Sequence, residues 1–305
     1  MDLIALRLAL YAALFAQFGI AAFGIYALEP GERGGGRPFR YARTLSILAV
    51  ASLGIAAFGI VAHLANMAGT GWWPVDVPML RSMLSETDLG KAWVVRIAAP
   101  LVAIFGSVLT RKRITPLLTL HLLCGGVGIG TLVWSGHAGS TEASAGLIHR
   151  LSDTAHMVAA AIWFGGLLSF VSLLLVNDSR DNQVRLAMTA RTLDQFSRVG
   201  MIAVLVIVVT GLFNAQMIFG LGRIDALSFP YATLFGLKLF LFAAMLAFAA
   251  FNRWRLTPAL KSDETAMATL TALRRTISLE SLAAVLLLGA VAWLGTLDPS
   301  ATGAV

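Results

Sequence analysis

The chain has 305 residues, of which 58% are hydrophobic and only 13% are charged. A soluble domain carries about 25% charged residues, so this composition argues for a protein that lies mostly in lipid. Intrinsic disorder is excluded because it requires low hydrophobicity, and a disulfide framework is excluded because Cys124 is the single cysteine. The net charge of +7 could indicate nucleic acid in a soluble protein, but here it indicates basic cytoplasmic loops.

Eight stretches are long enough to cross a bilayer, which takes about 20 mostly apolar residues. They span residues 3–28, 44–67, 92–109, 117–135, 148–176, 197–219, 231–251 and 276–296. The first should be a retained helix and not a signal peptide, because no small-residue cleavage site is evident before the charged loop at Glu29. We expect an all-α fold, a polytopic membrane helix bundle of eight transmembrane helices. It should be a single integral-membrane unit, with an N-terminal half at 1–130 and a second half at 131–305.

Basic residues in the connections predict the orientation of such a bundle. The odd-numbered connections hold 15 Lys and Arg residues, whereas the even-numbered connections hold four. We therefore expect the odd connections in the cytoplasm and both termini in the periplasm.

Four glycines lie inside the fourth span, at Gly125, Gly126, Gly128 and Gly130. A nucleotide-binding loop would need a preceding strand and a different spacing. Small residues instead let membrane helices pack closely. We therefore expect a helix contact here and no ATPase in the chain.

Ionisable side chains inside membrane spans are costly and are usually functional. Four of the five histidines lie toward the outer side: His63, His137, His149 and His156. His121 lies toward the cytoplasmic side. Cys124 follows it three residues later on the same helix and is either an inner metal ligand or an inert, packed thiol. A satisfied interhelical hydrogen bond is the alternative for any single histidine.

The fifth span carries the sharpest group, His149, Asp153 and His156. At 100° per residue these side chains share one stripe of the helix. Two imidazoles and a carboxylate could bind a transition metal, or Asp153 could orient a histidine. The structural alternative is an ion pair between Asp153 and a buried base, either Arg96 or Lys238.

Methionines accompany the outer histidines. His63 and Met67 are spaced i, i+4 in the second span, and Met79 and Met83 repeat that spacing in the following outer loop. Thioethers select Cu(I), and imidazole suits copper and zinc. Each methionine taken alone is better explained by packing in an apolar core, and it is the clustering of His and Met on the outer side that favours a metal site.

The last three spans add polar groups. Thr210, Asn214 and Met217 form one stripe, and Lys238 is too deep to reach the surface, so it should face a carboxylate or a water-filled cavity. Glu280 is interpreted as structural, with Asn252 and Arg253 as its expected partners.

Several of these segments match the pattern of one family. They are Ser135-Gly136-His137-Ala138, the segment from His149 to Gly166 with Asp153, His156 and Ile162-Trp163-Phe164-Gly165-Gly166, then Phe196-Ser197-Arg198, Tyr231, Lys238, Asn252-Arg253 and Glu280. Together they resemble the copper resistance protein D (CopD) family of bacterial inner-membrane proteins, most strongly from about residue 130 to 296. Gln195 departs from the pattern, because a basic residue is usual there.

The resemblance implies copper handling, usually movement of copper across the inner membrane toward the cytoplasm. On this hypothesis His63, Met67 and His137 capture the ion, with Met79 and Met83 as candidate further ligands, and His149, Asp153 and His156 pass it inward. The expected ligand is a copper ion, and the expected partners are the lipid bilayer and a periplasmic copper-binding protein, with no nucleic acid.

Two alternatives remain open. One is a b-type cytochrome, in which His63 and His156, or His121 and another span, hold haem. The other, which we rank lowest, is a metal-dependent enzyme, because no second carboxylate stands near the stripe as a general base. We expect the protein not to be an enzyme.

Overall fold

The computed structural model describes residues 2–33, 40–110, 112–136, 139, 143–175, 182–260 and 266–300. It confirms the all-α fold with eight helices long and apolar enough to cross a membrane. These helices are α1 (Asp2–Tyr26), α3 (Tyr41–Ala68), α5 (Asp88–Thr110), α6 (Ile114–Gly130) with its 3₁₀ extension η1 (Thr131–Ser135), α7 (Ala143–Leu175), α8 (Asn182–Ile218), α9 (Phe229–Phe251) and α11 (Ala266–Leu294). Shorter elements connect them, namely α2 (Pro30–Arg33), α4 (Val77–Glu86), η3 (Leu221–Ala226), the π-helical η4 (Asn252–Leu256) and α10 (Thr257–Ala259).

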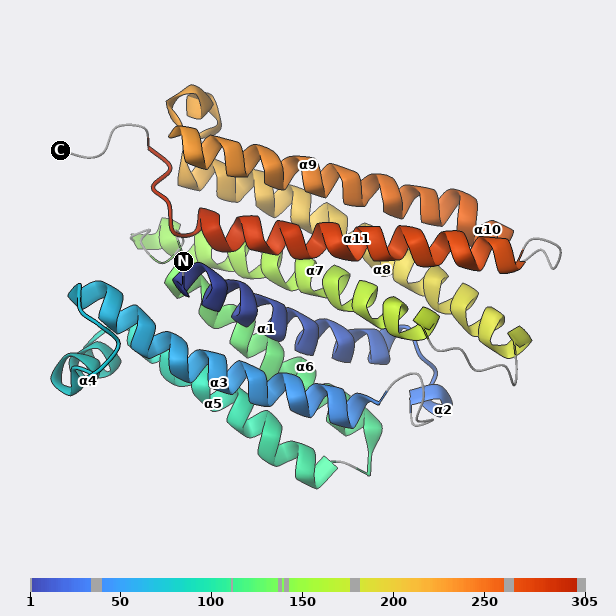
Figure 1. Ribbon diagram of the computed structural model, residues 1–305, viewed down its shortest axis with the longest axis horizontal. Coiled ribbons are helices and arrows are strands. Elements are labelled where there is room, and N and C mark those ends of the chain that lie inside the picture. Colours follow the sequence, from blue (N-terminus) through green and yellow to red (C-terminus); the bar gives the residue numbers. More distant parts are fainter. Residues whose placement is uncertain are drawn as a thin grey trace.

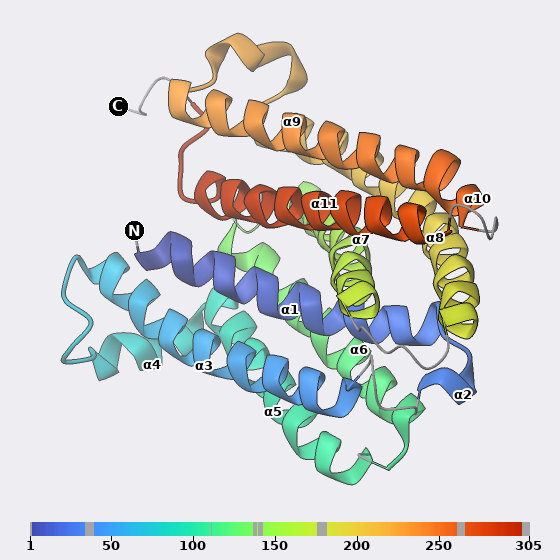
Figure 2. The ribbon, with the colours of Figure 1, turned by 45° about the vertical axis from the view of Figure 1, so that its right-hand side comes forward.

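Helix α1 occupies the middle of the bundle (Figures 1 and 2). It packs against α3 and α6 on one side and against α7 and α11 on the other. Helices α8 and α9 lie at the edge beyond α7 and α11, and their apolar side chains are mostly exposed. The start of α1, the end of α11, α4 and η3 lie at the same end of the bundle (Figure 1).

Paired glycines let α1 and α7 touch at backbone distance. A Cβ atom added at Gly19 would lie 2.0 Å from the carbonyl oxygen of Ala161, and one added at Gly165 would lie 2.2 Å from the Gly19 carbonyl carbon. The glycines of α6 pack on the other side of α1, where a Cβ at Gly128 would lie 2.8 Å from the side chain of Leu14. The predicted packing role of the α6 glycines is thus confirmed.

The connection after α3, predicted to be an outer loop, contains the helix α4. Its N-cap Asp76 accepts a hydrogen bond from the Met79 backbone N–H at 2.9 Å, and Pro78 lies in its first turn, where its missing N–H costs nothing. Met83 is only 5% exposed and belongs to the apolar core, and Met79 packs against that core. Both methionines therefore have the packing role that we had kept as the alternative.

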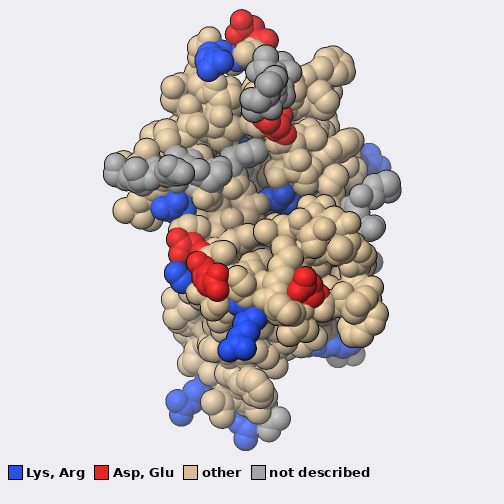
Figure 3. Space-filling model, turned by 90° about the vertical axis from the view of Figure 1, so that its left-hand side faces the viewer, with Lys and Arg blue, Asp and Glu red and all other residues tan. Residues whose placement is uncertain are grey.

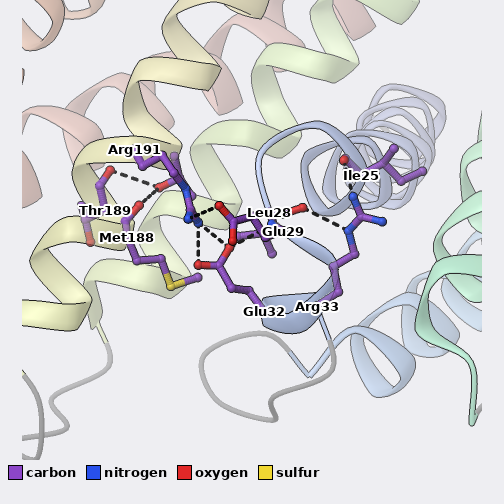
Figure 4. Close-up of polar contacts among 9 residues, drawn as sticks. Ile25, Leu28, Glu29, Glu32, Arg33, Met188, Thr189 and Arg191 are labelled. Carbon is purple, nitrogen blue, oxygen red and sulfur yellow. Dashed lines mark hydrogen bonds and ion pairs between the residues drawn. The ribbon is translucent and has the colours of Figure 1, made fainter.

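An ion-pair cluster ties the first connection to α8 at the opposite end of the bundle (Figure 4). Arg191 of α8 lies 2.7 Å from Glu29 and also binds both carboxylate oxygens of Glu32. Arg33 donates hydrogen bonds to carbonyl groups at the end of α1. Partial burial is the largest single influence on Glu32 and opposes its ionisation, but the hydrogen bonds from Arg191 and from the Glu29 backbone N–H, together with the charge of Arg191, outweigh it and lower the pKa of Glu32. The cluster joins the N-terminal half to the second half.

Candidate functional site

The α7 stripe meets a polar stripe on α8. His149 is 1% exposed, and Asp153 and His156 are half-buried. Asn214 of α8 donates a hydrogen bond from Nδ2 to Asp153 Oδ1 at 3.3 Å, and His156 Nδ1 lies 3.1 Å from Thr210 Oγ1. The two stripes, each predicted from helical spacing, therefore face each other.

The hydrogen bonds of Thr210 determine which nitrogen of His156 carries the proton. The Thr210 hydroxyl donates its one hydrogen to the carbonyl oxygen of Val206, at 2.5 Å. Toward His156 it must then act as acceptor, so Nδ1 carries the proton and Nε2 keeps a free lone pair. This is the arrangement in which a second partner fixes a histidine so that its other nitrogen can bind a metal.

His156 opens onto a cleft of 410 Å³ between α8 and α9, with α7 and α11 behind it. Apolar side chains line most of this cleft, and Lys238 and Met245 of α9 are among its lining residues. A second cavity of 330 Å³ continues along the same pair of helices toward Glu280, and Trp163 borders both. The cleft and the second cavity together therefore expose polar side chains along the α8–α9 pair, namely His156 and Lys238 in the cleft and Glu280 in the second cavity.

Asp153 has no ion pair within 4.0 Å among the described residues. Lys238 is close enough to interact with it electrostatically. Arg96, the other base that we had considered, binds Thr131 and Ser135 instead, so its expected pairing with Asp153 is wrong.

Glu280 is 1% exposed and is held by neutral donors. Trp163 Nε1 donates to one carboxylate oxygen at 2.8 Å, and Asn252 Nδ2 donates to the other at 3.2 Å. The expected partner Asn252 is confirmed, but Arg253 binds Ser197 instead. The indole of Trp163 is the partner that the sequence did not predict.

The outer residues do not form one compact group. His63 lines a separate cavity of 490 Å³ between α1, α3 and α5, whereas Met67, one turn further along α3, is 55% exposed and does not line it. His137 lies outside the described residues. Within the described ranges, no three His, Cys, Asp or Glu side chains lie close enough to hold a metal ion together.

Comparisons with known proteins show the family of the chain. The family "Copper resistance protein D-like, N-terminal domain" matches residues 1–147, and "Copper resistance protein D" matches residues 190–294. Copper resistance protein D of Pseudomonas syringae pv. tomato is 36% identical over 305 residues, covering 97% of this chain and 96% of the relative. This chain belongs to the copper resistance protein D family.

A second relative is more distant. The chain is 29% identical over 266 residues to the inner membrane protein YebZ of Escherichia coli (strain K12), covering 86% of each protein. No solved structure matches the chain. As a copper resistance family member with eight membrane-spanning helices, the protein is a copper-related, multi-pass protein of the bacterial inner membrane.

The remaining histidines bear on the haem alternative. His63 and His156 line different cavities, so the proposed bis-histidine pair has no common space. His121 is fully buried, and its Nε2 lies 2.9 Å from the Ser107 hydroxyl. Cys124 packs among alanines of α3 and α5. Neither the comparisons nor this geometry supports the bis-histidine cytochrome.

Proposed function

We propose that the protein transports copper ions across the inner membrane toward the cytoplasm, along the stripe of His149, Asp153 and His156. The observation that carries the proposal is the contact of His156 Nδ1 with Thr210 at the α8–α9 cleft, from which we infer that Nε2 keeps its lone pair for a metal ion. Neutral imidazole binds copper through such a lone pair. Transport moves the ion without chemical conversion, so no catalytic residue is assigned.

The outer residues would collect the ion. His63 and Met67 lie on the side from which, in the proposed orientation, copper arrives from the periplasm, and we propose that His137 acts with them. A periplasmic copper-binding protein is the partner that we propose for delivery there. Both termini would then be periplasmic, and the inner part of the route would lie in the second half, residues 131–305.

A route that carries an ion across a membrane needs weak ligands that the ion meets one after another. Conduction requires sites that bind well enough to admit an ion and loosely enough to release it. The absence of a three-ligand group among the described residues is consistent with such a route. Asp153 would supply negative charge beside His156, while Lys238 would oppose prolonged occupation by a cation.

Met245 extends the proposed route inward. It lines the cleft with His156, and it follows Lys238 by seven residues, about 10 Å along α9. Thioether sulfur is a soft ligand that selects Cu(I). The cleft therefore gives Met245 a place after His156 on the proposed route.

A vesicle assay tests the proposal. Purified protein is reconstituted into vesicles that contain a Cu(I)-selective dye, and Cu(I) is added outside with Zn²⁺ as the control ion. We expect dye response above protein-free vesicles for Cu(I). An optical spectrum and iron analysis of the same preparation test for haem. Vesicles that take up no copper in either orientation, or a Soret band with stoichiometric iron, would contradict the proposal.

A further inference from the structure

The cavity beside His63 holds two arginines as well as the histidine. Its volume is 490 Å³, and its polar lining includes Arg7 of α1, Trp93 and Arg96 of α5, and Ser135 of η1. Arg96 is 2% exposed, which is rare for a charged side chain without an opposite charge beside it.

The two guanidinium groups converge on Ser135. Arg7 Nη2 donates to the Ser135 carbonyl oxygen at 2.5 Å, and Arg96 Nη2 donates to the Ser135 hydroxyl at 3.0 Å. Like charges held this close repel each other, and partial burial strengthens the repulsion. Among the described residues, no Asp or Glu lines the cavity to offset them.

Hydrogen-bond donors also remain available there. Trp93 Nε1 is buried and has no acceptor in the described part of the chain. The Arg96 guanidinium lies 4.2 Å over the ring of Trp93, so this donor stands next to a positive charge. Buried N–H groups in proteins are normally satisfied. A cationic pair with an unsatisfied N–H beside it is the complement of a negatively charged acceptor.

We propose that this cavity binds an oxyanion, a phosphate or carboxylate group, between Arg7, Arg96 and the indole N–H of Trp93. The planar guanidinium matches the geometry of both groups and can bind them through two parallel hydrogen bonds. The rest of the lining is largely apolar, including Leu3, Leu6 and Leu10, so the cavity can also receive an apolar part attached to the anion. The oxyanion is either a free ion or the headgroup of an anionic lipid.

This inference goes beyond the proposed transport of copper. A bound oxyanion would also offset two positive charges near His63, where the proposed route collects a cation. Figure 3 looks onto this end of the molecule, and acidic and basic residues are scattered there over a mostly uncharged surface. Binding would thus depend on the arginines in the cavity and not on a charged surface patch.

Melting of the purified full-length protein in neutral detergent, without copper, tests the site. Sodium phosphate and sodium acetate are titrated at constant ionic strength against sodium chloride. Arg7→Gln removes one positive charge, and Trp93→Phe keeps an aromatic side chain while removing the indole N–H donor. Arg223→Gln is the matched control, because Arg223 is an exposed arginine of η3 at the same end.

We expect phosphate or acetate to raise the melting temperature of the wild type and of Arg223→Gln. A lost hydrogen bond to a charged group should weaken apparent affinity on the order of tenfold in Arg7→Gln and Trp93→Phe. If Arg7→Gln does not fold, the apparent anion affinity of Trp93→Phe is compared with that of the wild type.

Nanodiscs distinguish the two sources of the oxyanion. If it is a headgroup, discs with phosphatidylglycerol should stabilise the wild type relative to phosphatidylcholine discs, and phosphate should add nothing further. If it is a free ion, phosphate or acetate should stabilise the protein equally in both kinds of disc. The proposal is overturned if phosphate, acetate and phosphatidylglycerol all leave the wild type unchanged, or shift wild type, Arg7→Gln and Trp93→Phe equally. Because no copper is present, this result is independent of the transport assay.

Discussion

Replacing His156 with alanine should separate transport from stability. The substitution removes one hydrogen bond, from Nδ1 to Thr210. Thr210 keeps its own bond to the Val206 carbonyl oxygen, so it is not left as an unsatisfied donor. The expected loss is therefore the net value of a single hydrogen bond, about 0.6–1.5 kcal/mol. Since His156 opens onto a cleft, little additional cavity cost is expected.

The effect on copper should be much larger. Loss of a partner behind a metal ligand alone costs about 10–100-fold in affinity, so loss of the ligand itself should reduce copper uptake by at least about 100-fold. Asp153→Asn provides a second variant, which keeps an oxygen to accept the hydrogen bond from Asn214 but removes the charge. Leu239→Ala is the matched control, because Leu239 lines the same cleft and offers no ligand atom.

Copper uptake into dye-loaded vesicles and thermal melting in detergent are measured on the same preparations. The expected pattern is lost uptake in His156→Ala and Asp153→Asn with only a small decrease in melting temperature, and normal uptake in Leu239→Ala. If His156→Ala and Asp153→Asn both take up copper at the wild-type rate, the α7 stripe is not the route. Strong destabilisation of both variants would instead assign the stripe a structural role.

Three further predictions concern other parts of the chain. A reporter fused after Val305 should be active only if it functions in the periplasm, and activity of a reporter that functions only in the cytoplasm would reverse the proposed orientation. Met67→Leu nearly conserves volume, so it should cost under about 1.5 kcal/mol of stability while weakening Cu(I) binding; unchanged affinity in a Cu(I) titration would remove Met67 from the site. Glu32→Gln should cost under about 1 kcal/mol, because its ion pair is partly exposed. Since the folded-state pKa of Glu32 is lowered, the melting difference from wild type should be constant above about pH 4.3, the usual pKa of glutamate, and shrink as the pH falls through the lowered pKa. A difference that stays constant in strong acid would contradict that assignment.

Much of the fold could be predicted because apolar length is a property of the sequence alone. The eight spans are all present in the structure, although most of their helices extend further than expected. Helix α8 begins at Asn182 and not near residue 197, since its Arg-bearing segment continues the helix beyond the most apolar part. Hydropathy detects the apolar part of a helix but not its polar continuation.

The site could be predicted only one helix at a time. Helical spacing aligned Asp153 with His156 and Thr210 with Asn214, but the rotation of each helix and its choice of neighbour depend on packing throughout the bundle. For the same reason the sequence could not show that Arg96 faces the outer cavity and not Asp153. The tautomer of His156 depends on three groups from two helices, so no linear pattern could predict it.

The central position of α1 limits where the polypeptide chain can be cut into two fragments. The helix packs against α3 and α6 of the N-terminal half and also against α7 and α11 of the second half. A gene cut between α6 and α7 would therefore yield a second fragment with Gly165 and its neighbours uncovered, because Gly19 would be on the other polypeptide. We expect such fragments to accumulate only when they are co-expressed. A naturally occurring protein with the second segment alone would have to borrow an equivalent of α1 from another chain.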